Sequence, residues 1–187
     1  MLPLDRFKKD RQRARDASDP AASLCVAATV DDRGQPQVRT LVLRDIDDEL
    51  AIFVNATSPK WREIPNGIAI LTYWPSIQVQ YRLKVSTEPV PQPTVAASWA
   101  LRPDPPKHMD WYYETIAEQT SVAGTRAELL ANLGNVSEPL TAPTHARGLI
   151  LTPHTIERLD LTQDNGIHDR VLYTRTEEGW IESTLVP

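Results

Sequence analysis

The chain has only one cysteine among its 187 residues, few glycines (seven) and no long apolar run. A lone cysteine excludes an internal disulfide framework and any zinc or iron–sulfur site built from several cysteines. Since Cys25 lies in an apolar segment, we expect a small buried residue rather than a nucleophile. No segment is apolar over the length that a membrane helix needs, and the N-terminus lacks the apolar core of a signal peptide. We therefore expect a cytoplasmic protein that does not enter a membrane.

Several site motifs are also missing. The chain has neither the glycine-rich fingerprint of dinucleotide-binding folds nor the phosphate-binding loop of nucleoside triphosphatases. Its four histidines show no ligand spacing, so no metal site is expected. The net charge of −5, from 20 basic and 25 acidic residues, argues against nucleic-acid binding, which requires a basic surface. A small anionic ligand is compatible with this balance, because a few arginines in one pocket hardly alter the total.

The N-terminal segment is highly charged. Residues 3–17 have helical spacing, with Leu4 and Phe7 as apolar contacts. Acidic residues, Asp10 among them, are interspersed with the basic ones, which favours a solvated face over a surface that binds an acidic partner. Residues 1–20 are interpreted as a helical extension of one domain spanning 1–187, since no Gly/Ser linker interrupts the chain.

Most of the remaining sequence is typical of β-structure. Short apolar or alternating segments are separated by turn signals, which indicates an antiparallel meander rather than β–α–β units. Residues 77–86 alternate strictly between polar and apolar side chains, so this strand has one face of each kind. A sheet of five or six such strands tends to close into a barrel. The expected strands are 22–30, 37–44, 50–55, 67–74, 77–86, 148–152, 155–161, 170–175 and 180–186.

Two helices are expected between the halves of the sheet. Residues 93–103 have helical spacing and stop at Pro103. The second helix follows Gly124, with Thr125 and Glu128 at the spacing of a capping box and Gly134 where a C′ glycine belongs. The fold class is therefore α+β, mainly β, built on an antiparallel barrel with flanking helices.

Two positions in the first half of the chain combine positive charge with a local structure that fits an anion. Ser58, Pro59 and Lys60 are typical of a helix start, whose free N–H groups and lysine suit a phosphate. An ordinary capped helix with an exposed lysine explains the same residues. Arg39 lies in an apolar strand, where an unpaired charge is costly. It needs a surface position or a partner, and a phosphate suits its planar guanidinium.

A third position lies near the C-terminus. His168 is followed by Asp169 and Arg170 at the mouth of a predicted strand. A histidine beside an acid and a base is able to hydrogen-bond a polar ring, and it changes charge near neutral pH. A turn rich in charge explains these residues equally well.

In this order, the segments resemble the pyridoxamine 5′-phosphate oxidase family, the FMN-binding split barrels. The resemblance rests on AATVDDRGQPQVRTLVLR, FVNATSPK, the strand ending in Trp74 followed by VQYRL, then LRP, EQTS and IHDRVLYTR. It covers nearly the whole chain after residue 20, and its specificity comes from order and spacing rather than from one motif. It implies a six-stranded antiparallel split barrel, in a homodimer with FMN at the subunit interface.

The resemblance also implies which residues bind the flavin. Phe53 and Val54 match an aromatic–threonine pair with valine in place of threonine. Lys60 ends a Ser-Arg-Lys phosphate segment in which Pro59 replaces the arginine, and the tryptophan expected near Leu159 is absent. The implied FMN-binding residues are Arg39, Thr40, Leu41, Val42, Phe53, Val54, Ser58, Lys60, Gln80, Gln119, Thr120 and Arg170.

The substrate residues match the family less completely. Arg44 stands for a lysine, and Arg102 for an arginine, that hold the substrate phosphate, whereas Ser98 replaces a tyrosine. Gly166 stands where an arginine faces the pyridine ring, which leaves His168 to orient that ring. The segment PPKHMDWYYE after the LRP motif is additional and rich in aromatic residues. The implied catalytic residues are His168, Arg102 and Arg44.

The resemblance implies an FMN-dependent oxidoreductase like pyridoxamine/pyridoxine 5′-phosphate oxidase. Such an enzyme transfers a hydride from a small anionic substrate to flavin N5, and dioxygen reoxidises the flavin. One alternative is an FMN-binding reductase of the same fold that acts on a different substrate, which the loss of the pyridine-side residues favours. Another is a flavin-binding protein without turnover, or a relative of the same fold that has lost flavin. Flavin absorbance in the purified protein separates a relative without flavin from the enzymes.

Overall fold

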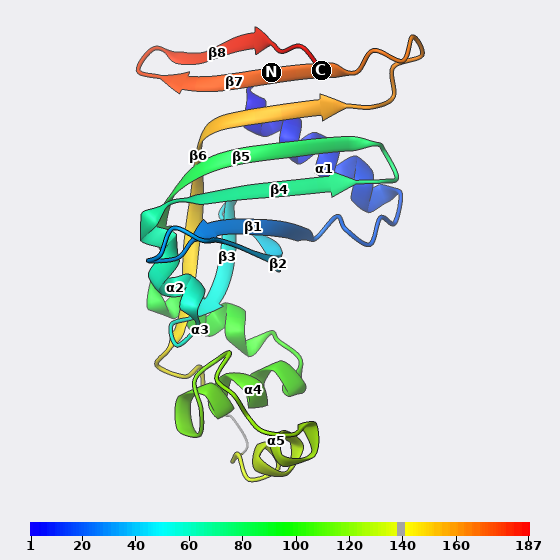
Figure 1. Ribbon diagram of the computed structural model, residues 1–187. Coiled ribbons are helices and arrows are strands. Elements are labelled where there is room, and N and C mark those ends of the chain that lie inside the picture. Colours follow the sequence, from blue (N-terminus) through cyan, green and yellow to red (C-terminus); the bar gives the residue numbers. More distant parts are fainter. Residues whose placement is uncertain (138–140) are drawn as a thin grey trace.

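The structure is a computed structural model that describes residues 1–137 and 141–187. Its strands are β1 (Leu24–Val30), β2 (Pro36–Ile46), β3 (Glu49–Asn55), β4 (Ile68–Trp74), β5 (Val79–Pro89), β6 (Ala146–Asp160), β7 (Asp169–Thr176) and β8 (Gly179–Thr184). They form one antiparallel sheet in the order β3-β2-β1-β4-β5-β6-β7-β8. An additional pairing of β3 with β6 closes strands β1 to β6 into a barrel, and β7 and β8 continue the sheet beyond it (Figure 1). The predicted six-stranded antiparallel split barrel is confirmed.

The long strand β6 accounts for the split. One edge of β6 pairs with β5, whereas the other edge pairs with β3 through residues 146–151 and with β7 through residues 155–160. The sequence predicts two strands here, and this prediction is wrong because β6 continues through Pro153. Pro153 has no N–H to donate, and it lies opposite Val85, beside the register shift between Lys84 and Val85.

The barrel interior is filled by the apolar faces of its strands. Tyr81 and Leu83 of β5 are buried and the intervening Arg82 and Lys84 are exposed, as the alternation predicts. Cys25 is 2% exposed within the same core. Burial raises the pKa of its thiol to about 12, which agrees with a packing role and not with that of a nucleophile.

Helix α1 (Pro3–Asp16) packs against the barrel. Phe7 is completely buried, with its ring centroid 5.4 Å from that of Trp74 and 5.0 Å from that of Tyr81. Asp10, 4% exposed, accepts hydrogen bonds from the Tyr81 hydroxyl (2.7 Å) and from Nε of Arg158 (3.0 Å). This buried network fixes α1 to strands β5 and β6.

Arg11 anchors the other side of α1. It is 2% exposed, and its guanidinium donates to a carboxylate oxygen of Asp45 (2.8 Å) and to the carbonyls of Ala22 and Leu43. The expectation of a solvated charged face is therefore wrong for Asp10 and Arg11. Both charges are buried, and each has partners on elements distant in the sequence.

The remaining helices are α2 (Pro59–Glu63), followed by a 3₁₀ turn (Ile64–Asn66), α3 (Gln92–Ala100), α4 (Asp104–Thr115) and α5 (Arg126–Leu133). Helices α3, α4 and α5 gather at the end of the molecule away from β7 and β8 (Figure 1). Helix α4 is not anticipated by the sequence analysis, because two prolines, Pro105 and Pro106, occupy its first turn. A proline there removes no intrahelical hydrogen bond. None of the described helices has the length and apolarity to cross a membrane.

The start of α5 agrees with the sequence and its end does not. Thr125 and Glu128 form the predicted capping box, with both reciprocal hydrogen bonds present. Gly134 has a φ of −63°, so it is not the left-handed C′ glycine that the sequence predicts.

Candidate cofactor and substrate site

A cavity of about 820 Å³ lies between the edge of the barrel at β2 and β3 and the helices α3 and α4. The residues that line this cavity are far apart in the sequence: Thr40 and Arg147 are separated by 107 positions. The predicted site residues that line it are Thr40, Leu41, Val42, Arg44, Phe53, Val54, Lys60, Arg102 and Gln119.

Lys60 faces the cavity with neutral partners. Its ammonium donates to Oγ of Ser58 (2.5 Å) and to Oε1 of Gln119 (3.3 Å), and the Gln119 N–H donates to Oγ1 of Thr57 (3.1 Å). Among the described residues, no carboxylate oxygen lies within 4 Å of this ammonium. Burial lowers the pKa of Lys60, and repulsion from Arg39 lowers it further. Glu63 opposes this lowering from a distance greater than 4 Å. A partly desolvated cation with no carboxylate in direct contact is a feature that suits an anion subsite.

Ser58 does not act as the sequence predicts. It has the extended backbone of an N-cap residue, but its side chain makes no capping hydrogen bond and accepts from Lys60 instead. Helix α2 is also a single short turn of five residues. An anion at this position would therefore be held by side chains such as that of Lys60 and not by a long helix.

Asn55 adds an unused donor to the cavity wall. Its Oδ1 accepts from both the N–H and the hydroxyl of Thr57 (2.9 and 2.7 Å), which assigns the opposite end of the amide, Nδ2, as the donor. Asn55 is 6% exposed, and Nδ2 has no hydrogen-bond partner among the described residues. A buried donor without a partner is costly, and Asn55 shares the cavity lining with Lys60, so an acceptor atom of a bound ligand would satisfy Nδ2.

Arg39 has a partner within the chain. Its guanidinium donates to a carboxylate oxygen of Glu63 (2.6 Å) and to the hydroxyl of Thr29, which itself donates to Glu63 (2.5 Å). Burial raises the pKa of Glu63, but the hydrogen bonds from Thr29 and Arg39 outweigh it, so the net pKa is lowered. Arg39 is close enough to Lys60 to lower the pKa of that lysine. Glu63 therefore neutralises, at least in part, the positive charge of Arg39, which would be costly if it were unpaired in the apolar strand β2.

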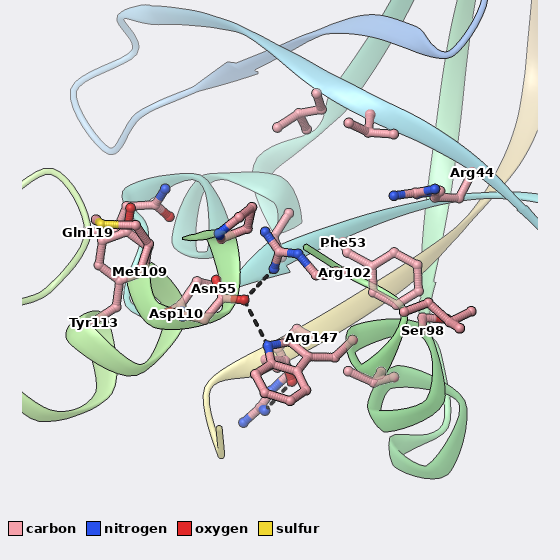
Figure 2. Close-up of a pocket in the computed structure, with 18 of the residues that line it drawn as sticks. Arg44, Phe53, Asn55, Ser98, Arg102, Met109, Asp110, Tyr113, Gln119 and Arg147 are labelled. Atoms are coloured by element: carbon pink, nitrogen blue, oxygen red, sulfur yellow. Dashed lines mark hydrogen bonds and ion pairs between the residues drawn. The ribbon is translucent and has the colours of Figure 1, made fainter. Parts of the chain in front are cut away.

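The predicted substrate residues lie in another part of the cavity. Arg44 is exposed and has no carboxylate oxygen within 4 Å among the described residues. Arg102 instead forms a short ion pair with Asp110, whose carboxylate also accepts from the indole Nε1 of Trp99 (2.9 Å). Figure 2 shows Asp110 between these two donors, with Arg44, Phe53 and Ser98 to one side of it. Burial raises the pKa of Asp110 above its ordinary value. The positive charge of Arg102 and the hydrogen bonds from Trp99 and Arg102 lower it, but they do not outweigh burial.

Arg39 and the remaining predicted residues do not line this cavity. Ser58 is 1% exposed and its hydroxyl accepts from Lys60, whereas Thr120 is exposed with a φ of 73°. Arg170 lies on β7 and pairs with Glu157 (2.9 Å), and His168 is exposed in the loop before β7. Gln80, on β5, pairs with Tyr73 and Leu159 in the sheet. Within one chain the structure therefore separates Gln80, His168 and Arg170 from the cavity that holds Arg44 and Lys60.

Three residues at or near the site, Asn55, Glu63 and Asp110, carry no signal in the sequence that marks them as site residues. Asn55 sits within the quoted motif FVNATSPK, but only the buried, unpartnered donor distinguishes it. Asp110 lies in the aromatic segment PPKHMDWYYE. The two prolines of this segment argue against a helix in the sequence, but α4 forms and places Asp110 in the cavity lining. The described residues contain no group of three or more His, Cys, Asp or Glu side chains placed to hold a metal ion.

Comparison with solved structures gives the class of the fold. PhzG from Burkholderia lata, solved in complex with tetrahydrophenazine-1-carboxylic acid, aligns with a TM-score of 0.85 at 22% identity, covering 100% of this chain and 93% of that one. A pyridoxamine 5′-phosphate oxidase-related, FMN-binding protein from Nostoc punctiforme aligns with a TM-score of 0.79 at 21% identity, covering 100% and 99%. The fold is thus that of the FMN-binding split barrels.

Sequence relatives then give the family. A pyridoxine/pyridoxamine 5′-phosphate oxidase from Shewanella frigidimarina is 32% identical over 193 residues, covering 99% of this chain and 89% of the relative. Those from Burkholderia thailandensis and Myxococcus xanthus are 31% and 30% identical, again over 99% of this chain. None of the protein-family models compared with the chain matches it. The chain belongs to the pyridoxine/pyridoxamine 5′-phosphate oxidase-like family of FMN-binding split barrels, and the predicted family is confirmed.

Proposed function

We propose that this protein is an FMN-dependent oxidoreductase that acts on a small anionic substrate as a homodimer. The observation that carries this proposal is the environment of Lys60. Its ammonium is partly buried in the cavity wall and contacts the neutral side-chain oxygens of Ser58 and Gln119. Relatives that span nearly the whole chain are named pyridoxine/pyridoxamine 5′-phosphate oxidases, and the family binds FMN.

The residues at the Lys60 end of the cavity fit the phosphate of FMN. Lys60 supplies positive charge, and Asn55 Nδ2 supplies a donor that has no acceptor among the described residues. Arg39 adds a second positive charge close by, although Glu63 offsets part of it. Bound here, FMN would supply hydride-transfer chemistry: N5 would accept a hydride from a substrate carbon, and the two electrons would reduce dioxygen, with two protons, to hydrogen peroxide.

A homodimer is supported by an apolar outer face on three neighbouring strands. Residues opposite each other in an antiparallel sheet share a face, and the register pairs Leu24 with Val42 and Ala28 with Val38. Tyr73 of β4 extends this face. Val38 is 67% exposed and Val42 is 44% exposed, so the chain alone leaves the apolar face open to water.

In the proposed dimer, His168, Arg170 and Gln80 act at the cavity of the second copy. Within one chain these residues lie away from the cavity, yet Arg170 and His168 belong to the motif IHDRVLYTR on which the resemblance rests. The role of Arg44 is to bind the substrate anion, and that of His168 is to orient the substrate ring. No acid–base pair is needed for direct hydride transfer.

The spectrum of the purified protein tests this proposal. We expect visible flavin absorbance after reconstitution with FMN, and bleaching of that absorbance when a substrate is added without oxygen. Hydrogen peroxide release with pyridoxamine 5′-phosphate tests the oxidase activity that the relatives' names state. A protein that retains no FMN under these conditions contradicts the proposed function.

The second candidate is an FMN-dependent oxidoreductase of the same fold with a different substrate. Two observations in the cavity favour it: the small Ser98 lines the wall, and Arg102 is already paired with Asp110. Losing a charged partner weakens phosphate binding by about 1.5–3 kcal/mol. Flavin that stays oxidised with saturating pyridoxamine 5′-phosphate but bleaches with another donor identifies this second function.

A further inference from the structure

The substrate part of the cavity contains an ion pair that alters its charge. Arg102 and Asp110 both line the cavity, and the Asp110 carboxylate accepts from Arg102 and from Nε1 of Trp99. The Asp110 side chain is 10% exposed and that of Arg102 is 36% exposed. Because the two charges are in direct contact, Arg102 contributes little net attraction for an incoming anion.

Arg44 is then the lining cation that no other group among the described residues engages. Arg147 also lines the cavity, but its guanidinium donates to the carbonyls of Thr144 and Ala146 and lies over the Trp61 ring, 5.9 Å from the ring centroid. Around Arg44, by contrast, the described residues place no carboxylate oxygen within 4 Å. Lys60 is engaged elsewhere in the cavity, with Ser58 and Gln119, where the proposed function places the flavin phosphate. One guanidinium matches one carboxylate in a two-point contact, whereas a phosphate ester carries nearly two charges and is better held by two or more cations.

The walls around Arg102 and Asp110 are apolar and aromatic. Trp99, Met109, Tyr113 and Phe53 contribute lining, and Figure 2 shows Met109 and Tyr113 on the side of Asp110 opposite to Arg44 and Phe53. The Trp99 indole N–H is already used by Asp110, so the rest of its ring offers an apolar surface. Such walls stabilise a planar ring by stacking and by burial of apolar area.

We propose that Asp110 makes this site selective for a ring-bearing monocarboxylate over a phosphate ester of the same ring, with Arg44 binding the carboxylate. This selectivity rests on the proposed function, because it concerns the substrate of the same flavin site. Asp110 is a specificity-determining residue, since it acts by neutralising Arg102 and not by touching the reacting atoms.

The test compares two ligands that share the same ring but differ in charge. One is 1-naphthoate, a monoanion, and the other is 1-naphthyl phosphate, which is a dianion at about pH 8 because its second pKa is about 6. Each is titrated by calorimetry into the FMN-reconstituted protein. We expect naphthoate to bind at least tenfold more tightly than naphthyl phosphate. Equal binding, or tighter binding of the phosphate, overturns the proposal.

Asp110→Asn keeps the shape and an acceptor for Trp99 but removes the negative charge. We expect it to shift the affinity ratio at least tenfold toward naphthyl phosphate, and an unchanged ratio overturns the proposal. The double variant Arg102→Leu/Asp110→Leu removes both charges, so we expect it to keep the wild-type ratio within about threefold. If instead it behaves like Asp110→Asn, charge is not the cause and the proposal fails.

Arg44→Gln provides a test that does not depend on the folding of the Asp110 variants, because Arg44 is exposed. We expect at least a tenfold loss of naphthoate affinity with unchanged FMN content, and unchanged naphthoate affinity overturns the proposal. FMN content is measured separately by absorbance. An absence of flavin therefore contradicts the proposed function, whereas a wrong affinity ratio contradicts the substrate class alone.

Discussion

The guanidinium of Arg39 and the carboxylate of Glu63 form an ion pair of 2.6 Å beside the cavity wall that carries Lys60. Thr29 bonds to both partners, so the negative charge is held in place. Glu63 therefore stabilises Arg39 when no ligand is bound. It also repels any phosphate that Arg39 and Lys60 attract, so the same contact has opposite effects on the folding of the protein and on its affinity for FMN.

Glu63→Gln separates these two effects. We expect the flavin-free protein to lose about 1–3 kcal/mol of stability, because a partly buried cation loses its counter-ion. We also expect FMN to bind several-fold more tightly, because the repelling charge is gone. Urea denaturation of the flavin-free protein and fluorescence titration with FMN measure the two quantities. Weaker FMN binding in this variant would contradict a phosphate subsite near Arg39.

Lys60→Ala is expected to weaken FMN retention by tenfold or more, because it removes the cation of the proposed phosphate subsite that has no carboxylate oxygen within 4 Å among the described residues. Arg39→Ala is expected to weaken retention by less, because Glu63 already offsets part of the Arg39 charge. Arg102→Ala is the matched control and is expected to have the smallest effect: it also removes an arginine, but from the substrate part of the cavity, where Asp110 already neutralises it. Dialysis followed by flavin absorbance measures the retained FMN. Equal retention in the three variants would mean that the phosphate lies elsewhere.

The barrel could be predicted from the sequence because its signals are local. The strict alternation in residues 77–86 and the short turns between strands give β5 and its neighbours directly. Lys60 and Arg44 could be identified because they lie within motifs whose order matches a known family. The structure then shows that both line one cavity.

What could not be predicted depends on contacts between distant parts of the chain. Asp10 looks like part of a solvated helix until Arg158, 148 positions away, is found beside it. Asp110 looks like one acidic residue in an aromatic segment until the fold of α4 places it against Arg102 and Trp99. A charge pattern in sequence does not state which charges are paired, and the pairing decides what the site binds.

The network between α1 and the barrel makes a stability prediction. Tyr81→Phe is expected to reduce the free energy of unfolding by about 1–3 kcal/mol, because the buried Asp10 loses a hydrogen bond. Tyr173→Phe is the control, since Tyr173 is buried in the same core and its hydroxyl has no hydrogen-bond partner among the described residues. Urea denaturation at about pH 7 measures both variants, and equal losses would contradict a specific role for the Asp10 contact.

The same network predicts a pH dependence. Burial alone would raise the pKa of Asp10, but hydrogen bonds from Tyr81 and Arg158 lower it below its ordinary value. A carboxyl whose folded pKa is lowered contributes stability that is present above the unfolded pKa of about 3.9 and lost as the pH falls through the folded pKa. We expect the stability difference between wild type and Tyr81→Phe to shrink in this acidic range. A difference that is constant down to about pH 2 would contradict this assignment.

The apolar face of β1, β2 and β4 gives the prediction that tests the assembly. Val38→Glu places a charge on this face at a 67% exposed position, opposite Ala28 in the register, where a second copy would have to desolvate it. We expect sedimentation velocity to show a monomer and FMN retention to fall with it, since the proposed site takes residues from both copies. Val122→Glu, in a loop where the side chain is 97% exposed, is the control and is expected to leave both unchanged. A Val38→Glu protein that remains dimeric would place the interface on another surface. In that case, pairing of two copies through this face could not bring His168 and Arg170 of one copy to the cavity of the other.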